Sequence, residues 1–234
     1  MPLMNIIPNR VFSSLYIILD CVFLTGLFLM LWFSGRKRAL AFGLFGGVLY
    51  WLVDYGIFYL ALGARVVEGA NTPLFLFWLS MSYGFTNFVW IWLMLDRDDK
   101  RLEWSVLIFF SWIAVALLSE NFGGNWHQIK ISRTTTGYHG VMALILIVGY
   151  AFVISENIFK DRKIPLAYLL FIGITVQLGW ETALLITGIR RAGIATLIID
   201  SLIETNLGMP YIWYIHRYVN RKLDEKGMLM RKSA

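Results

Sequence analysis

Five carboxylic acids lie inside long apolar stretches of the chain, where a charged side chain is costly. They are Asp20, Asp54, Glu181, Asp200 and Glu204, and the same stretches contain no lysine or arginine. An ionised group in the middle of a bilayer costs roughly 3 kcal/mol or more, so such residues normally face a bundle interior and are candidates for function. The sequence therefore predicts that these acids are protonated, hydrogen-bonded to neutral groups, or neutralised by a bound cation.

The spacing of the acids predicts shared helix faces. Asp200 and Glu204 are four residues apart, as are Gln177 and Glu181, and residues at i and i+4 lie on one face of a helix. We expect one acidic, hydrogen-bonded pocket built from these faces. The alternative is a set of separate interhelical hydrogen bonds that hold the helices together.

A local helix distortion is predicted beside these acids. Pro210 cannot donate a backbone hydrogen bond, so it frees the carbonyl of Asn206, and Gly208 lies between them. We expect a kink there, with Asn206 available to a ligand.

Aromatic side chains are expected around the same pocket. Trp51, Tyr55 and Trp180 lie near the acids within a chain that is 16% aromatic. Aromatic faces stabilise positive charge, so they suit a carbocation or a cationic ligand.

The composition identifies a membrane protein. Of 234 residues, 58% are hydrophobic and 15% are charged, and the mean hydropathy is +0.64, whereas soluble domains carry about 25% charged residues. Soluble enzymes, disordered chains and nucleic-acid binders are excluded. The basic residues, which give a net charge of +6, sit beside apolar stretches, so membrane lipid is the expected anionic partner. We expect an integral protein of the plasma membrane or endoplasmic reticulum.

The apolar stretches predict an all-α bundle of seven transmembrane helices, because open strands cannot satisfy their backbone in lipid. Residues 1–216 are expected to form one domain, followed by a basic tail at 217–234. The predicted spans are 11–33, 39–63, 73–95, 104–119, 138–155, 166–188 and 194–216.

The distribution of basic residues orients this bundle. With seven spans, 15 lysines and arginines fall on one side of the membrane and six on the other. The positive-inside rule then predicts a cytoplasmic C-terminus and an N-terminus outside. In that orientation all five acids fall in the outer half of the membrane, and the pocket is expected to open outward.

Cofactor chemistry is not expected. A retinal Schiff base requires a lysine in a span, and the last span has none. The three histidines are not spaced as a ligand set and no zinc motif occurs. We expect neither a metal nor another cofactor.

Three features together resemble the small seven-helix terpene cyclases of fungal meroterpenoid and indole-diterpene pathways and their bacterial relatives. These features are Gly179-Trp180-Glu181 with Gly188-Ile189-Arg190, the segment Glu204-Thr205-Asn206-Leu207-Gly208-Met209-Pro210, and an acid in the second span. The resemblance implies that one carboxylate in the second span and one in the last are needed. Here these are Asp54 and either Asp200 or Glu204. Asp54 departs from the family pattern, because it is an aspartate three residues after Trp51 rather than a glutamate directly after a tryptophan.

The resulting hypothesis is an enzyme that cyclises a prenyl-derived lipid or its epoxide by protonation. Asp54 and Glu204 are the main acid and orienting pair, and Asp200 and Glu181 support them. Desolvation of a carboxyl group in an apolar pocket keeps it protonated at neutral pH, which this chemistry needs. The alternative is a transporter or sensor coupled to protons or cations, in which the acids bind the ion and the kinked helix gates it.

Overall fold

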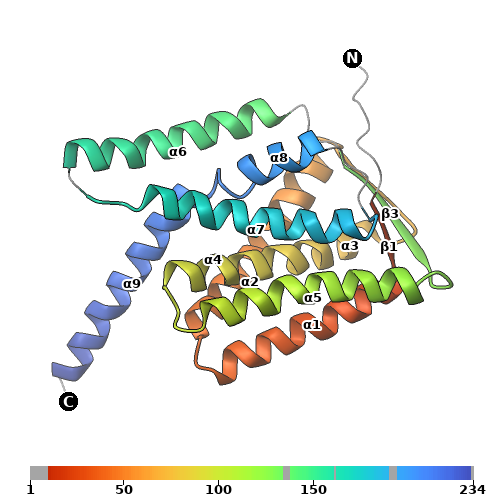
Figure 1. Cartoon of the computed structure of the whole chain (residues 1–234), viewed down its shortest axis with the longest axis horizontal. Coiled ribbons are helices and arrows are strands. Elements are labelled where there is room, and N and C mark those ends of the chain that lie inside the picture. Colours follow the sequence, from red (N-terminus) through yellow and green to blue (C-terminus); the bar gives the residue numbers. More distant parts are fainter. Residues whose placement is uncertain (1–9, 134–137, 161, 190–193, 233–234) are drawn as a thin grey trace.

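The computed structural model describes residues 10–133, 138–160, 162–189 and 194–232. It is a helical bundle whose long helices run side by side (Figure 1). Within the described residues, six helices are long and apolar enough to cross a membrane: Ser14–Phe33, Lys37–Ala61, Thr72–Leu95, Arg101–Phe122, Gly140–Lys160 and Leu166–Ile186. The membrane-spanning, helical character predicted from composition is therefore supported, while the count of seven and the orientation stay predictions.

Two of these spans change their helical winding partway along. The second span is α2 (Lys37–Trp51) followed by the π-helix η1 (Leu52–Ala61), and the third is α3 (Thr72–Ser80), the π-helix η2 (Met81–Phe85) and α4 (Thr86–Leu95). A π-helical segment widens the backbone and shifts the side chains that follow it, and such segments are frequent at functional sites. Both segments contribute side chains to the cavity described below.

The remaining helices complete the bundle. They are α1 (Ser14–Phe33), α5 (Arg101–Phe122), α6 (His139–Lys160), α7 (Leu166–Ile186), α8 (Ile194–Ile203) and α9 (Met209–Lys232). The third span is central, because 83% of its most apolar stretch is buried, against 22 to 56% for the other five.

Small residues allow the second and third spans to approach closely. A Cβ atom added to Gly84 would lie 3.0 Å from the Cα atom of Gly47, and one added to Gly46 would collide with the ring of Phe88. Glycine is used in this way where helices pack in lipid without a hydrophobic driving force. The contact packs α2 directly against η2, and η1 continues from α2.

The seventh predicted span is interrupted. Residues 194–216 form α8 and the first part of α9, with a turn between Ile203 and Met209. The two helices point in different directions in Figure 1. The kink predicted at Pro210 is thus a complete break over residues 204–208, which ends just before the proline. The segment that was predicted as a separate tail continues α9 to Lys232.

A three-stranded antiparallel sheet, which the span analysis missed, covers one end of the bundle. It consists of β1 (Arg10–Ser13), β3 (Gln128–Arg133) and β2 (Arg65–Glu68), in that spatial order. Its strands are too short and too widely separated in sequence to produce a recognisable alternation. We call this end of the molecule the sheet end.

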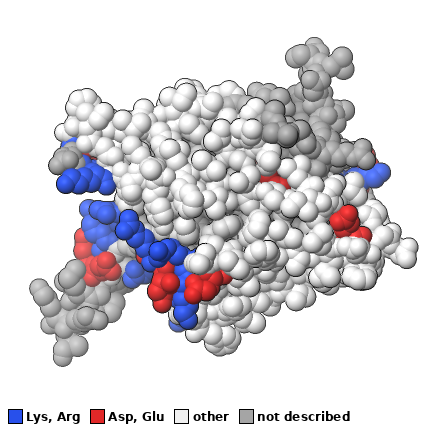
Figure 2. All heavy atoms as spheres, viewed as in Figure 1, with Lys and Arg blue, Asp and Glu red and all other residues white. Residues whose placement is uncertain are grey.

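The opposite end carries most of the visible basic residues, and we call it the basic end (Figure 2). There the turn after α4 is held by Arg36, whose Nε and Nη2 atoms donate to Asp98 at 2.8 and 3.0 Å. His216 contacts Asp96 of the same turn at 2.6 Å. The separation of the two ends matches the charge asymmetry used for orientation, although Arg190 and Arg191, which were counted in it, lie outside the described residues.

Candidate functional site

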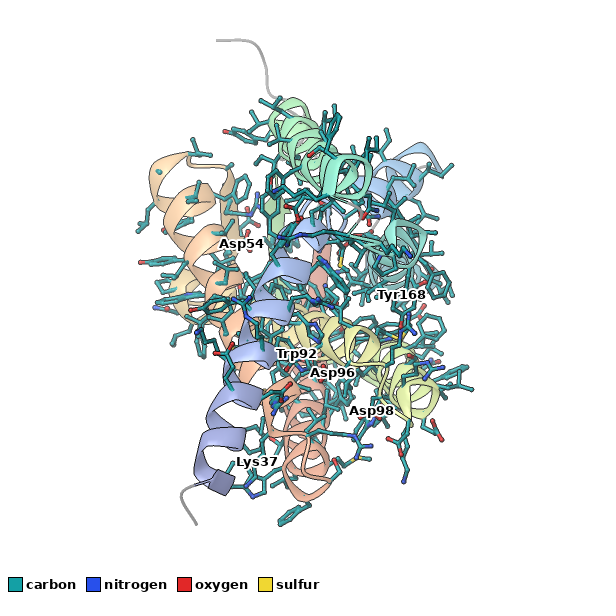
Figure 3. All side chains as sticks on the ribbon, turned by 90° about the vertical axis from the view of Figure 1, so that its left-hand side faces the viewer. Lys37, Asp54, Trp92, Asp96, Asp98 and Tyr168 are labelled. Atoms are coloured by element: carbon teal, nitrogen blue, oxygen red, sulfur yellow. The ribbon has the colours of Figure 1, made fainter. Side chains whose placement is uncertain are left out.

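A cavity of about 280 Å³ lies among the second, third and sixth spans and the break between α8 and α9. Three of the predicted acids line it: Asp54, Glu181 and Glu204. Figure 3 shows Asp54 on the side of its helix that faces the other helices. The remaining lining residues are Arg10, Leu49, Tyr50, Val53, Phe58, Arg65, Tyr83, Phe88, Ile91, Met142, Gln177, Trp180, Thr205, Leu207, Gly208 and Ile212.

Asp54 forms a buried ion pair. The Nε atom of Arg65 donates to its Oδ1 atom at 2.7 Å, and the two residues are both 2% exposed. Arg65 is the first residue of β2, and its guanidinium also lies 4.3 Å above the ring of Phe58. The prediction that this acid is protonated, hydrogen-bonded to neutral groups or neutralised by a bound cation is therefore wrong. An arginine from the connection at the sheet end neutralises it.

A second arginine reaches Glu181 in the same way. The Nη2 atom of Arg10, the first residue of β1, lies 3.8 Å from the Oε1 atom of Glu181. Both residues are buried, at 7% and 1% exposure. Because β1 and β2 both pair with β3, the sheet holds both arginines in the cavity wall nearest the sheet end.

Gln177 connects the two glutamates. Its Nε2 atom donates to Glu204 at 2.8 Å and approaches Glu181 at 3.4 Å. Its Oε1 atom accepts a hydrogen bond from the hydroxyl of Thr205 at 2.7 Å. The i, i+4 pairing predicted for Gln177 and Glu181 is thus present, and this amide links α7 to the helix break.

Aromatic rings form much of the remaining wall. Tyr50 and Tyr83 meet edge to face at 4.8 Å between ring centroids, and Tyr83 lies 5.8 Å from Trp180. Trp180 packs in turn on Trp112 at 5.4 Å. The sequence pointed to Trp180, and the structure adds Tyr50, which contacts Tyr83.

Four of the residues proposed from sequence do not line the cavity. Trp51 and Tyr55 stack on each other at 5.6 Å, with Trp51 edge-on to Phe77. Asp200 is buried within α8, and Asn206 accepts a hydrogen bond from Tyr150 at 3.2 Å. These four residues belong to the elements that form the cavity or flank it, but their side chains are not part of its wall.

Asp20 lies elsewhere in the bundle. Its two carboxylate oxygens accept hydrogen bonds from the indole of Trp78 at 3.0 Å and from the hydroxyl of Ser82 at 3.1 Å. It is 1% exposed and does not line the cavity. This is the interhelical role that the alternative interpretation of the acids described.

The sequence analysis missed Arg10 and Arg65 because they stand outside the apolar stretches and entered it only as two of the six basic residues on the outer side. Their strands, of four residues each, are too short to mark them by an alternating pattern. The arrangement can bind a molecule with an apolar body, exchange protons with it and stabilise charge that develops on it. Among the described residues, no group of three or more histidines, cysteines or acids is arranged to hold a metal ion, and the absence of cofactors stays a prediction.

Comparison of the chain with family models, with curated proteins and with solved structures found no match.

Proposed function

We propose that this protein is a membrane-embedded enzyme that cyclises a prenyl-derived lipid or its epoxide by acid catalysis. The observation that carries the proposal is the convergence of carboxyl groups and aromatic rings on one cavity inside an apolar bundle. Ligand pockets are largely apolar with a few polar groups that converge, and usually measure about 300 to 1,000 Å³. The cavity, at about 280 Å³, suits a compact apolar molecule.

The contacts support different roles for two of the acids. Arg65 stabilises the ionised carboxylate of Asp54 at 2.7 Å, which fits a group that accepts a proton or stabilises a cation. Glu204 instead accepts a hydrogen bond from the neutral amide of Gln177, and it lies at the helix break, where the backbone can adjust. We assign Glu204 as the proton donor and Asp54 as the acceptor.

The proposed reaction is an isomerisation. Glu204 transfers its proton to an epoxide oxygen or an alkene carbon, the carbocation closes onto a second double bond, and a C–H bond then yields its proton to Asp54. Return of that proton to Glu204 resets the site. Tyr83 and Trp180 line the cavity, and aromatic faces stabilise positive charge.

Lateral entry from the membrane fits the cavity walls. Leu49 lines the cavity and is also 38% exposed on the bundle surface. Met142 of α6 lines it from another helix, and 22% of the apolar stretch of α6 is buried. A hydrophobic substrate can therefore reach the site between helices that face lipid.

The test is mass spectrometry of lipid extracts from cells that express the wild type or a variant, after feeding farnesyl and geranylgeranyl alcohols and their epoxides. Glu204→Gln and Asp54→Asn are each expected to lower the yield of a cyclised isomer by at least about 100-fold, the usual range for general acid–base groups. Asp20→Asn is the matched control, because it neutralises a buried acid outside the cavity. Loss of product in all three variants, or no product from the wild type, would contradict the proposal.

A second function is favoured by the break between α8 and α9. Interrupted helices with acids beside the break are typical of transporters coupled to protons or cations. In that case uptake of a ligand would depend on pH and on Glu204, and extracts would contain no new compound. Proton-flux measurements on proteoliposomes with the same three variants separate the two functions.

A further inference from the structure

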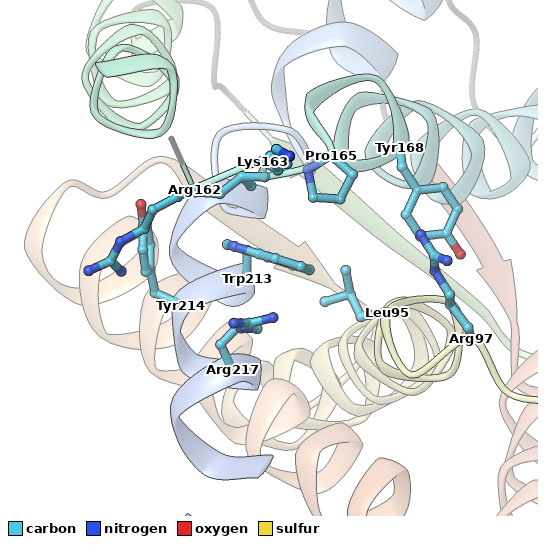
Figure 4. Close-up of a pocket in the computed structure, with 10 residues that line it drawn as sticks. Leu95, Arg97, Arg162, Lys163, Pro165, Tyr168, Trp213, Tyr214 and Arg217 are labelled. Carbon is cyan, nitrogen blue, oxygen red and sulfur yellow. The ribbon is translucent and has the colours of Figure 1, made fainter. Parts of the chain in front are cut away.

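A second cavity, of about 370 Å³, lies at the basic end and is unrelated to the acidic site. Four cations from three separate segments line it: Arg97 from the turn after α4, Arg162 and Lys163 from the connection before α7, and Arg217 from α9. Figure 4 shows them around Trp213. No aspartate or glutamate is among the lining residues.

Among the described residues, three of these cations have no carboxylate close by, whereas Arg162 lies 3.4 Å from Glu156. Several other basic residues at this end also lie within 4 Å of a carboxylate: Arg36 of Asp98, Arg38 of Asp224 and Lys222 of Glu225. Within the described ranges, Arg97, Lys163 and Arg217 have no such partner. Their positive charge is therefore directed to the cavity without an internal counter-ion.

The backbone is strained at the same place. Arg97 and Lys163 have φ angles of 51° and 46°, and they are the two residues other than glycine with positive φ in the described part of the chain. Side chains other than glycine adopt this conformation at a cost in free energy, and the strain tends to persist at functional sites. Both strained residues present a cation to one cavity.

Aromatic rings orient the guanidinium groups. The Cζ atom of Arg97 lies 5.7 Å from the ring centroid of Tyr168, and that of Arg217 lies 5.6 Å from Trp213. The hydroxyl of Tyr168 donates to the carbonyl of Met94 at 2.6 Å, which fixes the ring. Guanidinium groups placed in this way present planar donors that match a phosphate.

We infer that this cavity binds the phosphate headgroup of an anionic membrane lipid. Arg97, Lys163 and Arg217 supply the charge for one or two phosphate groups, and Arg162 adds a donor that it shares with Glu156. The N-terminus of α7, which begins at Leu166, adds the positive end of a helix dipole. Leu95, Ile164 and Pro165 form an apolar wall for the carbons that join the headgroup to its chains. A soluble phosphate offers the same charge but leaves this wall exposed to water.

The test is native mass spectrometry of the full-length protein in detergent, titrated with phosphatidic acid or phosphatidylcholine. The double variant Arg97→Gly with Lys163→Gly removes two cations and relieves the backbone strain. Its control, Lys100→Ala with Lys222→Ala, removes two cations at the same end outside the cavity. Inorganic pyrophosphate is added as a competitor, and thermal unfolding of each protein is followed in parallel.

Phosphatidic acid is expected to bind the wild type and the control alike, about tenfold more tightly than phosphatidylcholine, and to lose about tenfold in the glycine variant. The glycine variant is expected to unfold at or above the temperature of the wild type. Displacement by equimolar pyrophosphate would reassign the site to soluble phosphate. Equal binding of both lipids, or unchanged binding in the glycine variant, would overturn the inference. If the double variant fails to fold, the single variants must each show about a threefold loss.

Discussion

Asp20 and Asp54 are both buried carboxyl groups in apolar helices, and their surroundings separate them. Asp20 is held by two neutral donors, Trp78 and Ser82, where helices pack tightly. Asp54 faces a guanidinium and a cavity, on a π-helical segment. Burial of an acid in a membrane helix therefore does not mark a candidate site by itself. The cavity beside Asp54 and the arginine that the sheet brings to it are what distinguish this acid from Asp20.

Removing the counter-charge should produce the largest effect. Arg65→Ala leaves Asp54 buried without its cation, and breaking a buried ion pair from one side costs about 3 to 5 kcal/mol. We expect a large loss of stability in unfolding by denaturant in detergent. The double variant Arg65→Ala with Asp54→Asn should recover part of that loss, because no charge is left unpaired. Equal stability of the single variant and the wild type would show that the pair does not form.

Neutralising the other acid should cost less and leave the function intact. Asp20→Asn keeps the shape of the side chain but replaces one acceptor oxygen by a donor opposite Trp78 or Ser82, which costs about 1 to 3 kcal/mol. Thermal unfolding should report this loss, while the cyclised product in lipid extracts stays at the wild-type level. A drop in product as large as that of Asp54→Asn would remove the distinction between the two acids.

The ion pair between Arg36 and Asp98 at the basic end should contribute least to stability. It serves as a reference for the buried pair of Arg65 and Asp54. Burial alone raises the pKa of Asp98, but the hydrogen bonds and charge of Arg36 outweigh it and hold that pKa below its usual range. The pair therefore stabilises the folded state above about pH 4, and this contribution is lost as the pH falls through the folded-state pKa.

Because solvent and salt screen such a pair, its contribution is at most about 1 kcal/mol. Stability measured between pH 5 and pH 2.5 should fall less steeply in Asp98→Asn than in the wild type. Parallel curves for the two proteins would show that Arg36 and Asp98 do not interact in solution.

The helices and three of the cavity acids could be predicted from the sequence, because lipid forces apolar runs into helices and makes any acid inside them conspicuous. The counter-charges could not. Arg10 and Arg65 lie outside the runs, and a sheet of strands far apart in sequence brings them to Glu181 and Asp54.

The sequence also could not predict which side chains near the acids line the cavity. Helical periodicity assumes 3.6 residues per turn, whereas Trp51 and Tyr55 flank or lie in the π-helix η1, where that count fails. Likewise, Glu204 was placed one turn beyond Asp200 on a continuous helix, and α8 ends just before it.

The central claim is that the cavity beside Asp54 and Glu204 holds a hydrophobic ligand, and photoaffinity labelling tests it most directly. A farnesyl alcohol that carries a diazirine is irradiated with the protein in bilayers, with and without excess farnesol, and the labelled peptides are sequenced. We predict that labelling removed by farnesol falls on Leu49–Phe58 and Leu207–Ile212, and that it persists in Asp20→Asn. Labelling spread evenly over the outer faces of the helices and insensitive to farnesol would contradict the claim.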